Sequence, residues 1–196
     1  CTRSLLCAER SALNFLQHLS GIATLTNHFV QTIKGNKTHI TDTRKTTPGM
    51  RRLQKWAVIQ GGGVNHRLGL YDAVLIKENH ATACGGVENA IKHAREKSIS
   101  KNKQVPIFVE AETIDEVERL IHLKPDRIML DNMDTDTLRI CVEKIRTKDP
   151  SIVIEATGGY NISNIKLVAE IGVDLISIGS LTHSAPCFDL SLILES

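Results

Sequence analysis

Short apolar runs alternate with amphipathic stretches from residue 38 to the C-terminal part of the chain. Runs of this length that are apolar almost throughout are typical of strands buried on both faces. They predict strands at 38–42, 73–77, 106–112, 127–131, 152–156 and 175–179. The stretches between them have helical periodicity and predict helices at 85–98, 114–122, 134–147 and 161–171.

The first part of the chain has a different pattern. Apolar residues recur at helical spacing over 8–34, and Gly35 predicts the end of that segment. Gly21 lies in the middle, where a glycine weakens a helix. One helix or two helices are therefore equally compatible with this part of the sequence.

The alternation of strands and helices predicts a parallel sheet covered by helices. Charged residues follow most of the strands, at the ends where ligands bind in α/β barrels and in open doubly wound sheets. Charges from five successive strands converge most simply if the sheet curls. A complete eight-stranded barrel usually takes about 250 residues, and this chain has 196. We expect one domain over 1–196, an incomplete parallel α/β barrel of six to seven strands surrounded by helices.

Composition removes several classes of function. The net charge is only +2, which gives no reason to expect nucleic acid or a membrane surface as a partner. No apolar run approaches the roughly 20 residues that cross a bilayer. The five cysteines are widely spaced and odd in number, so neither a disulfide framework nor a zinc site is predicted. We expect reduced, mostly buried thiols in a cytoplasmic protein.

The charged residues at the predicted strand ends divide into two halves. The basic half consists of Arg44, Lys45, His66, Arg67 and Lys77, with Arg10 as a candidate from the first helix. Guanidinium groups bind carboxylates in bidentate fashion and lysines supply point charge, so this half suits a small anion with carboxylates or phosphates.

The acidic half contains Glu112 and Asp131, with Glu155 as a further candidate. Carboxylates suit a divalent cation or ribose hydroxyls. The glycine pair Gly158 and Gly159 precedes a predicted helix, and such a position offers backbone N–H groups to a phosphate. The two halves together predict a transferase site for an anionic acceptor beside a magnesium-bound sugar phosphate.

Longer motifs resemble the quinolinate phosphoribosyltransferase family, and they follow the family's order over essentially the whole chain. The most specific is Thr43-Arg44-Lys45-Thr46-Thr47-Pro48-Gly49. The other segments that carry the resemblance are 9–16, 19–24, 61–70, 76–80, 109–112, 129–132, 155–159 and 179–184.

The resemblance implies transfer of a phosphoribosyl group from phosphoribosyl pyrophosphate to quinolinate. The products would be nicotinate mononucleotide for NAD synthesis, pyrophosphate and carbon dioxide. It also implies Mg²⁺ as cofactor and a homodimer or larger homo-oligomer. The quinolinate site would comprise Arg10, Thr43, Arg44, His66, Arg67 and Lys77, with Arg10 reaching in from a neighbouring subunit. The phosphoribosyl pyrophosphate site would comprise Lys45, Glu112, Asp131, Thr157, Gly158, Gly159, Gly179 and His183. Glu112 and Asp131 would bind Mg²⁺ directly or through water.

The sequence departs from the family's pattern in three places. Thr157 stands where serine is more frequent, and Glu78 stands where aspartate is common. The chain begins at Cys1 and reads directly into the first predicted helix, so we expect the family's N-terminal domain to be absent. That expectation leaves open whether the barrel alone is catalytically active.

Two alternatives to this enzyme remain at the level of the sequence. One is a molybdenum-transport-associated homologue with another acceptor, although the full basic set favours a dicarboxylate. The other is a catalytically silent fragment or binding module that keeps the ligand contacts.

Overall fold

A single parallel sheet organises the computed structural model, which describes residues 2–100 and 104–194. Its strands are β1 (His39–Thr41), β2 (Val74–Ile76), β3 (Ile107–Ala111), β4 (Arg127–Asp131), β5 (Val153–Thr157) and β6 (Leu175–Ser177). The helices are α1 (Thr2–Thr32), α2 (Arg51–Gln60), α3 (Glu78–Ala83), α4 (Val87–Ser100), α5 (Ile114–Leu123), α6 (Thr135–Lys148), α7 (Ile165–Ile171) and α8 (Ser180–His183).

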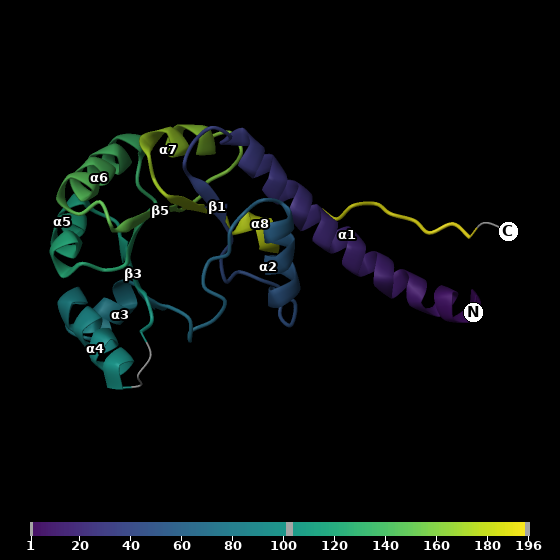
Figure 1. The fold of residues 1–196 in the computed structure, drawn as a ribbon, viewed down its shortest axis with the longest axis horizontal. Helices are drawn as coiled ribbons and strands as arrows, with labels where there is room; N and C mark the ends of the chain where they lie inside the picture. Colours follow the sequence, from purple (N-terminus) through teal and green to yellow (C-terminus); the bar gives the residue numbers. More distant parts are fainter. Residues whose placement is uncertain (1, 101–103, 195–196) are drawn as a thin grey trace.

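The sheet is an incomplete barrel. Its strand order is β1-β6-β5-β4-β3-β2, and every pair is parallel. Within the described residues β1 and β2 do not pair with each other, which leaves a seam, and Val64 bridges to Thr41 on the β1 side of it. Helices α3 to α7 follow one another along an arc outside the strands (Figure 1). The predicted incomplete parallel barrel with outer helices is confirmed, with six strands in the described part.

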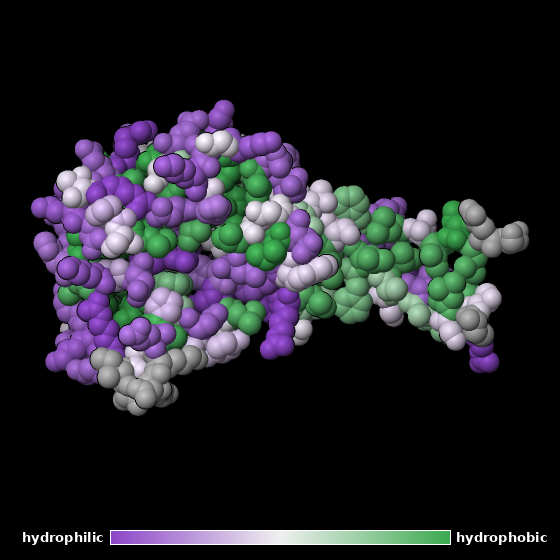
Figure 2. All heavy atoms as spheres, viewed as in Figure 1, coloured by the Kyte–Doolittle hydropathy of each residue, from purple (hydrophilic) through white to green (hydrophobic). Residues whose placement is uncertain are grey.

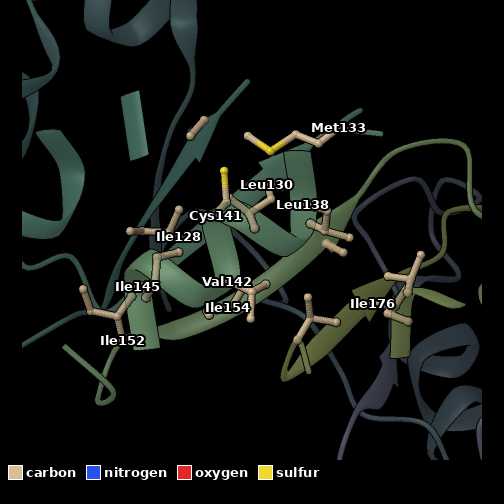
Figure 3. Packing of buried hydrophobic residues seen from close by; sticks show 14 of the residues in the cluster. Ile128, Leu130, Met133, Leu138, Cys141, Val142, Ile145, Ile152, Ile154 and Ile176 are labelled. Atoms are coloured by element: carbon tan, nitrogen blue, oxygen red, sulfur yellow. The ribbon is translucent and has the colours of Figure 1, made fainter. Parts of the chain in front are cut away.

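Successive side chains of each strand point to opposite faces of the sheet, so the strands contribute to two separate apolar regions. Ile128, Leu130 and Ile154 face outward and join the main core, which also includes α6 (Figure 3). On the opposite face, Phe108 and Met129 belong to a small separate cluster inside the barrel. Most apolar burial therefore lies between the sheet and the helices, and the barrel interior is left with room for polar side chains.

Helix α1 is continuous, and Gly21 does not break it. A Cβ atom at Gly21 would lie 1.9 Å from the carbonyl oxygen of Pro186, so the missing side chain lets the C-terminal segment cross the helix. The crossing segment is fixed where the Phe188 N–H donates to the Gln17 carbonyl at 3.1 Å. The Gln17 side chain in turn donates to the Leu190 carbonyl at 3.0 Å.

The first half of α1 and the C-terminal segment project together from the barrel as an apolar arm (Figures 1 and 2). Its exposed side chains are Leu5, Leu6, Phe15, Leu16, Phe188, Leu190, Leu192, Ile193 and Leu194. Contiguous apolar surface of this kind marks an interaction site on a protein.

Three helices were not expected from the pattern. The buried residues of α2 are Gln54, Lys55, Ala57 and Val58, so half of its inner face is polar and the apolar period is hidden. Helix α3 buries no residue, and α8 spans only four. Helix α7 begins at Ile165 rather than at 161, so the glycine pair at 158–159 is not adjacent to its N-terminus.

The expectation of mostly buried thiols is wrong. Cys141 is buried in the core and Cys84 is partly buried, but Cys7 and Cys187 are exposed on the apolar arm. Cys1 lies outside the described residues. None of the helices in the described ranges has the length and apolar character needed to cross a membrane.

Candidate active site

A cavity of about 940 Å³ opens at the carboxyl ends of the strands. Both predicted halves of the site meet around it. The sequence-predicted residues that line it are Thr43, Arg44, Lys45, His66, Arg67, Lys77, Asp131, Thr157, Gly158, Gly159, Gly179 and His183. The structure thus brings together every predicted site residue except Arg10 and Glu112.

Glu110, rather than the predicted Glu112, lines this cavity. Strand β3 ends at Ala111, and the Glu112 N–H donates to Glu116 Oε2 at 2.8 Å as the chain turns into α5. A neighbouring cavity of about 380 Å³ is lined by both Glu110 and Glu112, but only Glu110 also lines the large one. The sequence offers both carboxylates two residues apart, and the point at which the strand ends decides which one faces the site.

Arg10 lies on the apolar arm. Its side chain is exposed and does not line the large cavity of its own chain. Its expected contribution to a neighbouring subunit stays a prediction.

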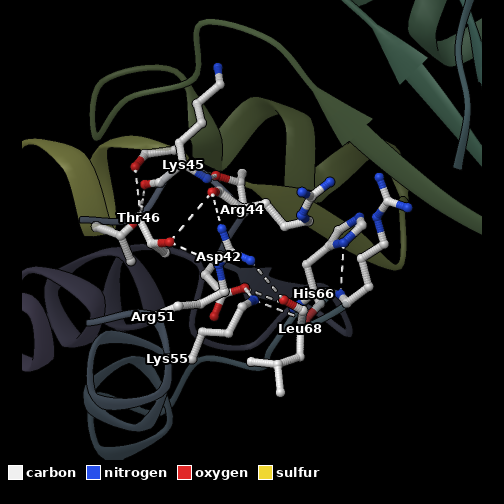
Figure 4. A network of polar contacts seen from close by, with 12 residues as sticks. Asp42, Arg44, Lys45, Thr46, Arg51, Lys55, His66 and Leu68 are labelled. Carbon is white, nitrogen blue, oxygen red and sulfur yellow. Dashed lines mark hydrogen bonds and ion pairs between the residues drawn. The ribbon is translucent and has the colours of Figure 1, made fainter. Parts of the chain in front are cut away.

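A buried ion pair holds the loops that carry the basic half (Figure 4). The side chains of Asp42 and Lys55 are 0% and 2% exposed and pair directly. Asp42 Oδ1 also accepts from the His66 N–H at 2.9 Å, and Lys55 Nζ donates to the His66 carbonyl at 2.9 Å. The main chain of His66 is therefore held on both sides, which places Arg67 opposite Arg44.

Burial dominates the protonation of this pair. It raises the pKa of Asp42 and lowers the pKa of Lys55, although the attraction between the two side chains opposes both shifts. A buried pair of this kind is most vulnerable when only one partner is removed, because the other charge is then left uncompensated.

Arg51, on α2, holds the same loops together through hydrogen bonds from its side chain. Its Nε donates to Thr46 Oγ1 at 2.9 Å, and its Nη1 donates to the Leu68 carbonyl at 3.3 Å. Nη2 donates to the Arg44 carbonyl at 3.5 Å (Figure 4). One guanidinium thus spans the loop that follows β1 and the loop that precedes β2, so the two loops are fixed relative to each other.

The basic half is electrostatically unfavourable without an anion. Burial, and then the nearby charge of Arg44, lower the pKa of the Arg67 guanidinium, while Asp72 and Glu110 oppose the shift. Arg67 Nη1 donates to the Ala73 carbonyl at 3.1 Å, which fixes its direction. An anion bound between Arg44 and Arg67 would relieve their repulsion.

Carboxylates line the other side of the cavity. Glu110 pairs with Lys77, and Asp131 ends β4, where its Oδ2 accepts from the Asn132 amide at 3.1 Å. Tyr160 also lines the cavity; burial and then the charge of Asp131 raise the pKa of its hydroxyl. Sequence reasoning missed Tyr160, since it follows the glycine pair without any motif of its own.

Two of these carboxylates could form part of a Mg²⁺ site. In the part of the chain that the structure describes, no three histidine, cysteine or acidic residues are grouped to hold a metal alone. Mg²⁺ is usually bound by one or two carboxylates, waters and substrate phosphates. Glu110 and Asp131 supply the carboxylate part of such a set.

A third part of the lining is suited to phosphate. A Cβ atom at Gly179 would lie 3.2 Å from Lys45 Cδ and 3.3 Å from the His183 ring, so these residues lie together. At the end of the adjacent strand β5, Gly158 has φ +141° and packs against Asn132. Small residues and a cationic side chain at one place allow a phosphate to approach the backbone closely.

Replacing Gly158 with alanine is expected to lower the free energy of unfolding by about 1–3 kcal/mol. The alanine would have to adopt a φ of +141°, and its Cβ would lie 2.8 Å from Asn132 Oδ1. Gly159→Ala is the matched control, because a Cβ there meets nothing within 4 Å. Chemical denaturation of both variants checks this, and equal stability of the two would contradict the strain at Gly158.

Comparison with known proteins gives a consistent result. The family described as quinolinate phosphoribosyl transferase, C-terminal domain, matches residues 22–193. A carboxylating nicotinate-nucleotide pyrophosphorylase from Mycobacterium leprae is 41% identical over 97% of this chain and 66% of its own length. A probable enzyme of the same name from Synechocystis is 45% identical over 96% of this chain and 63% of its own length.

Solved structures agree with the sequence comparison. The structure of nicotinate-nucleotide pyrophosphorylase from Francisella tularensis is 45% identical, with a TM-score of 0.88 over 96% of this chain and 65% of that one. The chain therefore spans just under two thirds of the length of these relatives.

Proposed function

The chain belongs to the quinolinate phosphoribosyl transferase family, because residues 22–193 match that family's C-terminal domain, and we propose that it makes nicotinate mononucleotide for NAD synthesis. A phosphoribosyl group would pass from phosphoribosyl pyrophosphate to the ring nitrogen of quinolinate, with release of pyrophosphate and carbon dioxide. The observation that carries the proposal is the single cavity in which basic loops face carboxylates and a glycine-rich phosphate region.

Quinolinate has two adjacent carboxylates, and the basic half offers a matching set of cations. Arg44 and Arg67 can each bind a carboxylate in bidentate fashion, and Lys77 adds a point charge. Thr43 and His66 complete this side as hydrogen-bonding groups. Such an arrangement orients the ring nitrogen toward the sugar, which is catalysis by positioning.

The sugar phosphate would occupy the opposite side. Lys45, Thr157, Gly158, Gly159, Gly179 and His183 line the part of the cavity suited to its phosphates. Glu110, in place of Glu112, and Asp131 would face the ribose hydroxyls and bind Mg²⁺. Bound Mg²⁺ supplies charge stabilisation for the departing pyrophosphate. The carboxylates stabilise the positive charge that develops on the anomeric carbon.

Loss of carbon dioxide needs little further machinery. As the carboxylate next to the ring nitrogen leaves, an electron pair stays on the ring carbon. The positive charge of the newly alkylated nitrogen stabilises that pair, the cations of the basic half add to the effect, and a proton from water then forms the new C–H bond. The structure supports this role because Arg67 is directed by the Ala73 carbonyl and, among the residues that the structure describes, forms no ion pair with a carboxylate.

The apolar arm supports assembly into a homodimer or larger homo-oligomer. Its exposed apolar surface is larger than scattered surface residues would explain (Figure 2). Arg10 lies on this arm, so assembly would carry it to the site of a neighbouring copy. The free, exposed thiols of Cys7 and Cys187 fit a reducing compartment, and we propose a cytoplasmic location.

The proposal is tested by a product assay on the full-length protein with carboxyl-labelled quinolinate, phosphoribosyl pyrophosphate and Mg²⁺. We expect equal amounts of nicotinate mononucleotide and labelled carbon dioxide, with no product when any component is omitted. Binding of both substrates without product would favour a catalytically silent module. Binding of phosphoribosyl pyrophosphate without binding of quinolinate would favour a homologue with another acceptor.

A further inference from the structure

Four side chains form a closed ring of contacts at the floor of the large cavity. Arg127 Nη1 lies 2.6 Å from Glu155 Oε2, and His66 Nε2 lies 3.5 Å from the same oxygen. The edge of one ring meets the face of the other between His66 and Phe108, whose centroids are 5.6 Å apart. Arg127 closes the ring, with its guanidinium carbon 4.0 Å from the Phe108 centroid.

Glu155 is the charged centre of this ring. Its side chain is fully buried, on the inward face of β5. Burial favours the neutral carboxyl, but His66 and Arg127 together outweigh that influence and lower the pKa of Glu155. The group is therefore an ionised carboxylate beneath a site that binds anions, and none of the proposed chemical steps uses it.

The contacts of His66 define which ring nitrogen carries its proton. Nδ1 accepts from the Arg67 N–H at 2.8 Å, so Nδ1 is unprotonated and the proton of the neutral ring is on Nε2. Nε2 faces Glu155 Oε2. At 3.5 Å this contact is longer than a normal hydrogen bond, so its effect on the direction of the ring is electrostatic.

The ring also forms a partition. His66 lines both the large cavity and a second cavity of about 340 Å³ near the barrel seam. Phe108 and Arg127 line the second cavity, and Glu155 lines the first. The four side chains thus lie between the two spaces, and His66 and Glu155 are the two that a molecule bound in the large cavity would face.

We propose that Glu155 is a positioning residue for the acceptor: held by Arg127, it attracts the Nε2 proton of His66, and together with the Arg67 N–H it sets the tautomer and the ring direction of His66. His66 in turn holds the Arg67 main chain through Nδ1, so a change at Glu155 would reach a guanidinium that faces the acceptor. The effect on the acceptor rests on the proposed function, whereas the effect on the His66 tautomer does not.

The test compares the full-length protein with Glu155→Gln, which keeps the shape of the side chain and removes its charge. Nitrogen NMR of ¹⁵N-histidine-labelled protein reports the tautomer, with the His66 signal assigned by its loss in His66→Gln. Calorimetry gives the dissociation constants of quinolinate and of phosphoribosyl pyrophosphate. Glu155→Asp serves as the conservative variant that retains the carboxylate.

We expect His66 to be protonated at Nε2 in the unaltered protein and to gain an Nδ1-protonated population in Glu155→Gln. In Glu155→Gln the dissociation constant of quinolinate should rise about tenfold, and that of phosphoribosyl pyrophosphate should change less than about twofold. In Glu155→Asp the ring should keep the tautomer of the unaltered protein. An unchanged tautomer in Glu155→Gln, or equal weakening of both ligands, would overturn the proposal. If Glu155→Gln does not fold, the unaltered protein decides: a His66 ring protonated at Nε2 supports the proposal, and a ring protonated at Nδ1 overturns it. A changed tautomer in a protein that never binds quinolinate would overturn the proposed function and leave the hold of Glu155 on His66 supported.

Discussion

Replacing Lys55 with methionine is expected to lower the free energy of unfolding by about 3–5 kcal/mol. Methionine fills similar space but cannot pair with Asp42, whose carboxylate is fully buried. The His66 carbonyl would also lose its donor. Equilibrium denaturation, followed by a spectroscopic signal, measures the change.

Two further variants separate the missing charge from the missing side chain. Asp42→Asn with Lys55→Met removes both charges and should recover most of the lost stability, because no buried charge remains uncompensated. Lys166→Met, on the exposed face of α7, should change stability by less than about 0.5 kcal/mol. A loss in Lys55→Met no larger than the loss in Lys166→Met would contradict the account of the buried pair.

Replacing Arg44 with alanine is expected to weaken quinolinate binding by about 10²–10³-fold. The guanidinium lies in the loop after β1, where Arg51 donates to the Arg44 carbonyl and holds the main chain in place. Phosphoribosyl pyrophosphate should bind within about threefold of its original affinity, a difference of less than 1 kcal/mol. Calorimetric titration with each ligand separately measures both constants.

The opposite selectivity is expected at the next position. Lys45→Ala should weaken phosphoribosyl pyrophosphate more than quinolinate, because Lys45 lies beside Gly179 and His183 in the phosphate region. Arg44→Lys should not restore quinolinate affinity, since an ammonium group lacks the planar pair of donors. Equal loss of both ligands in Arg44→Ala would contradict the division of the cavity into two halves.

Most of the strands could be predicted from the sequence because they are short, largely apolar runs, although the only apolar residue of β1 is Ile40. β4 has the predicted bounds, and the other strands lie within one to two residues of theirs. Helix α2 could not be found in this way. Its buried face carries Gln54 and Lys55, which satisfy polar partners in other loops rather than the apolar core.

The site was predictable as a constellation but not in every residue. Charges at strand ends and the motif around Arg44 identified most of the lining. Periodicity could not choose between Glu110 and Glu112, because that choice depends on where β3 ends. Tyr160 and the ring around Glu155 depend on contacts between residues far apart in the chain, and no local pattern contains those contacts.

The central claim is that one cavity holds a dicarboxylate between Arg44, Arg67 and Lys77, beside a sugar phosphate. Calorimetric titration of the full-length protein with quinolinate, and in parallel with nicotinate, tests it most directly. Nicotinate has the same ring with one carboxylate fewer. We predict that quinolinate binds at one site per chain and that nicotinate binds at least about tenfold more weakly. Equal affinity for the two acids, or no heat of binding with quinolinate, would contradict the claim.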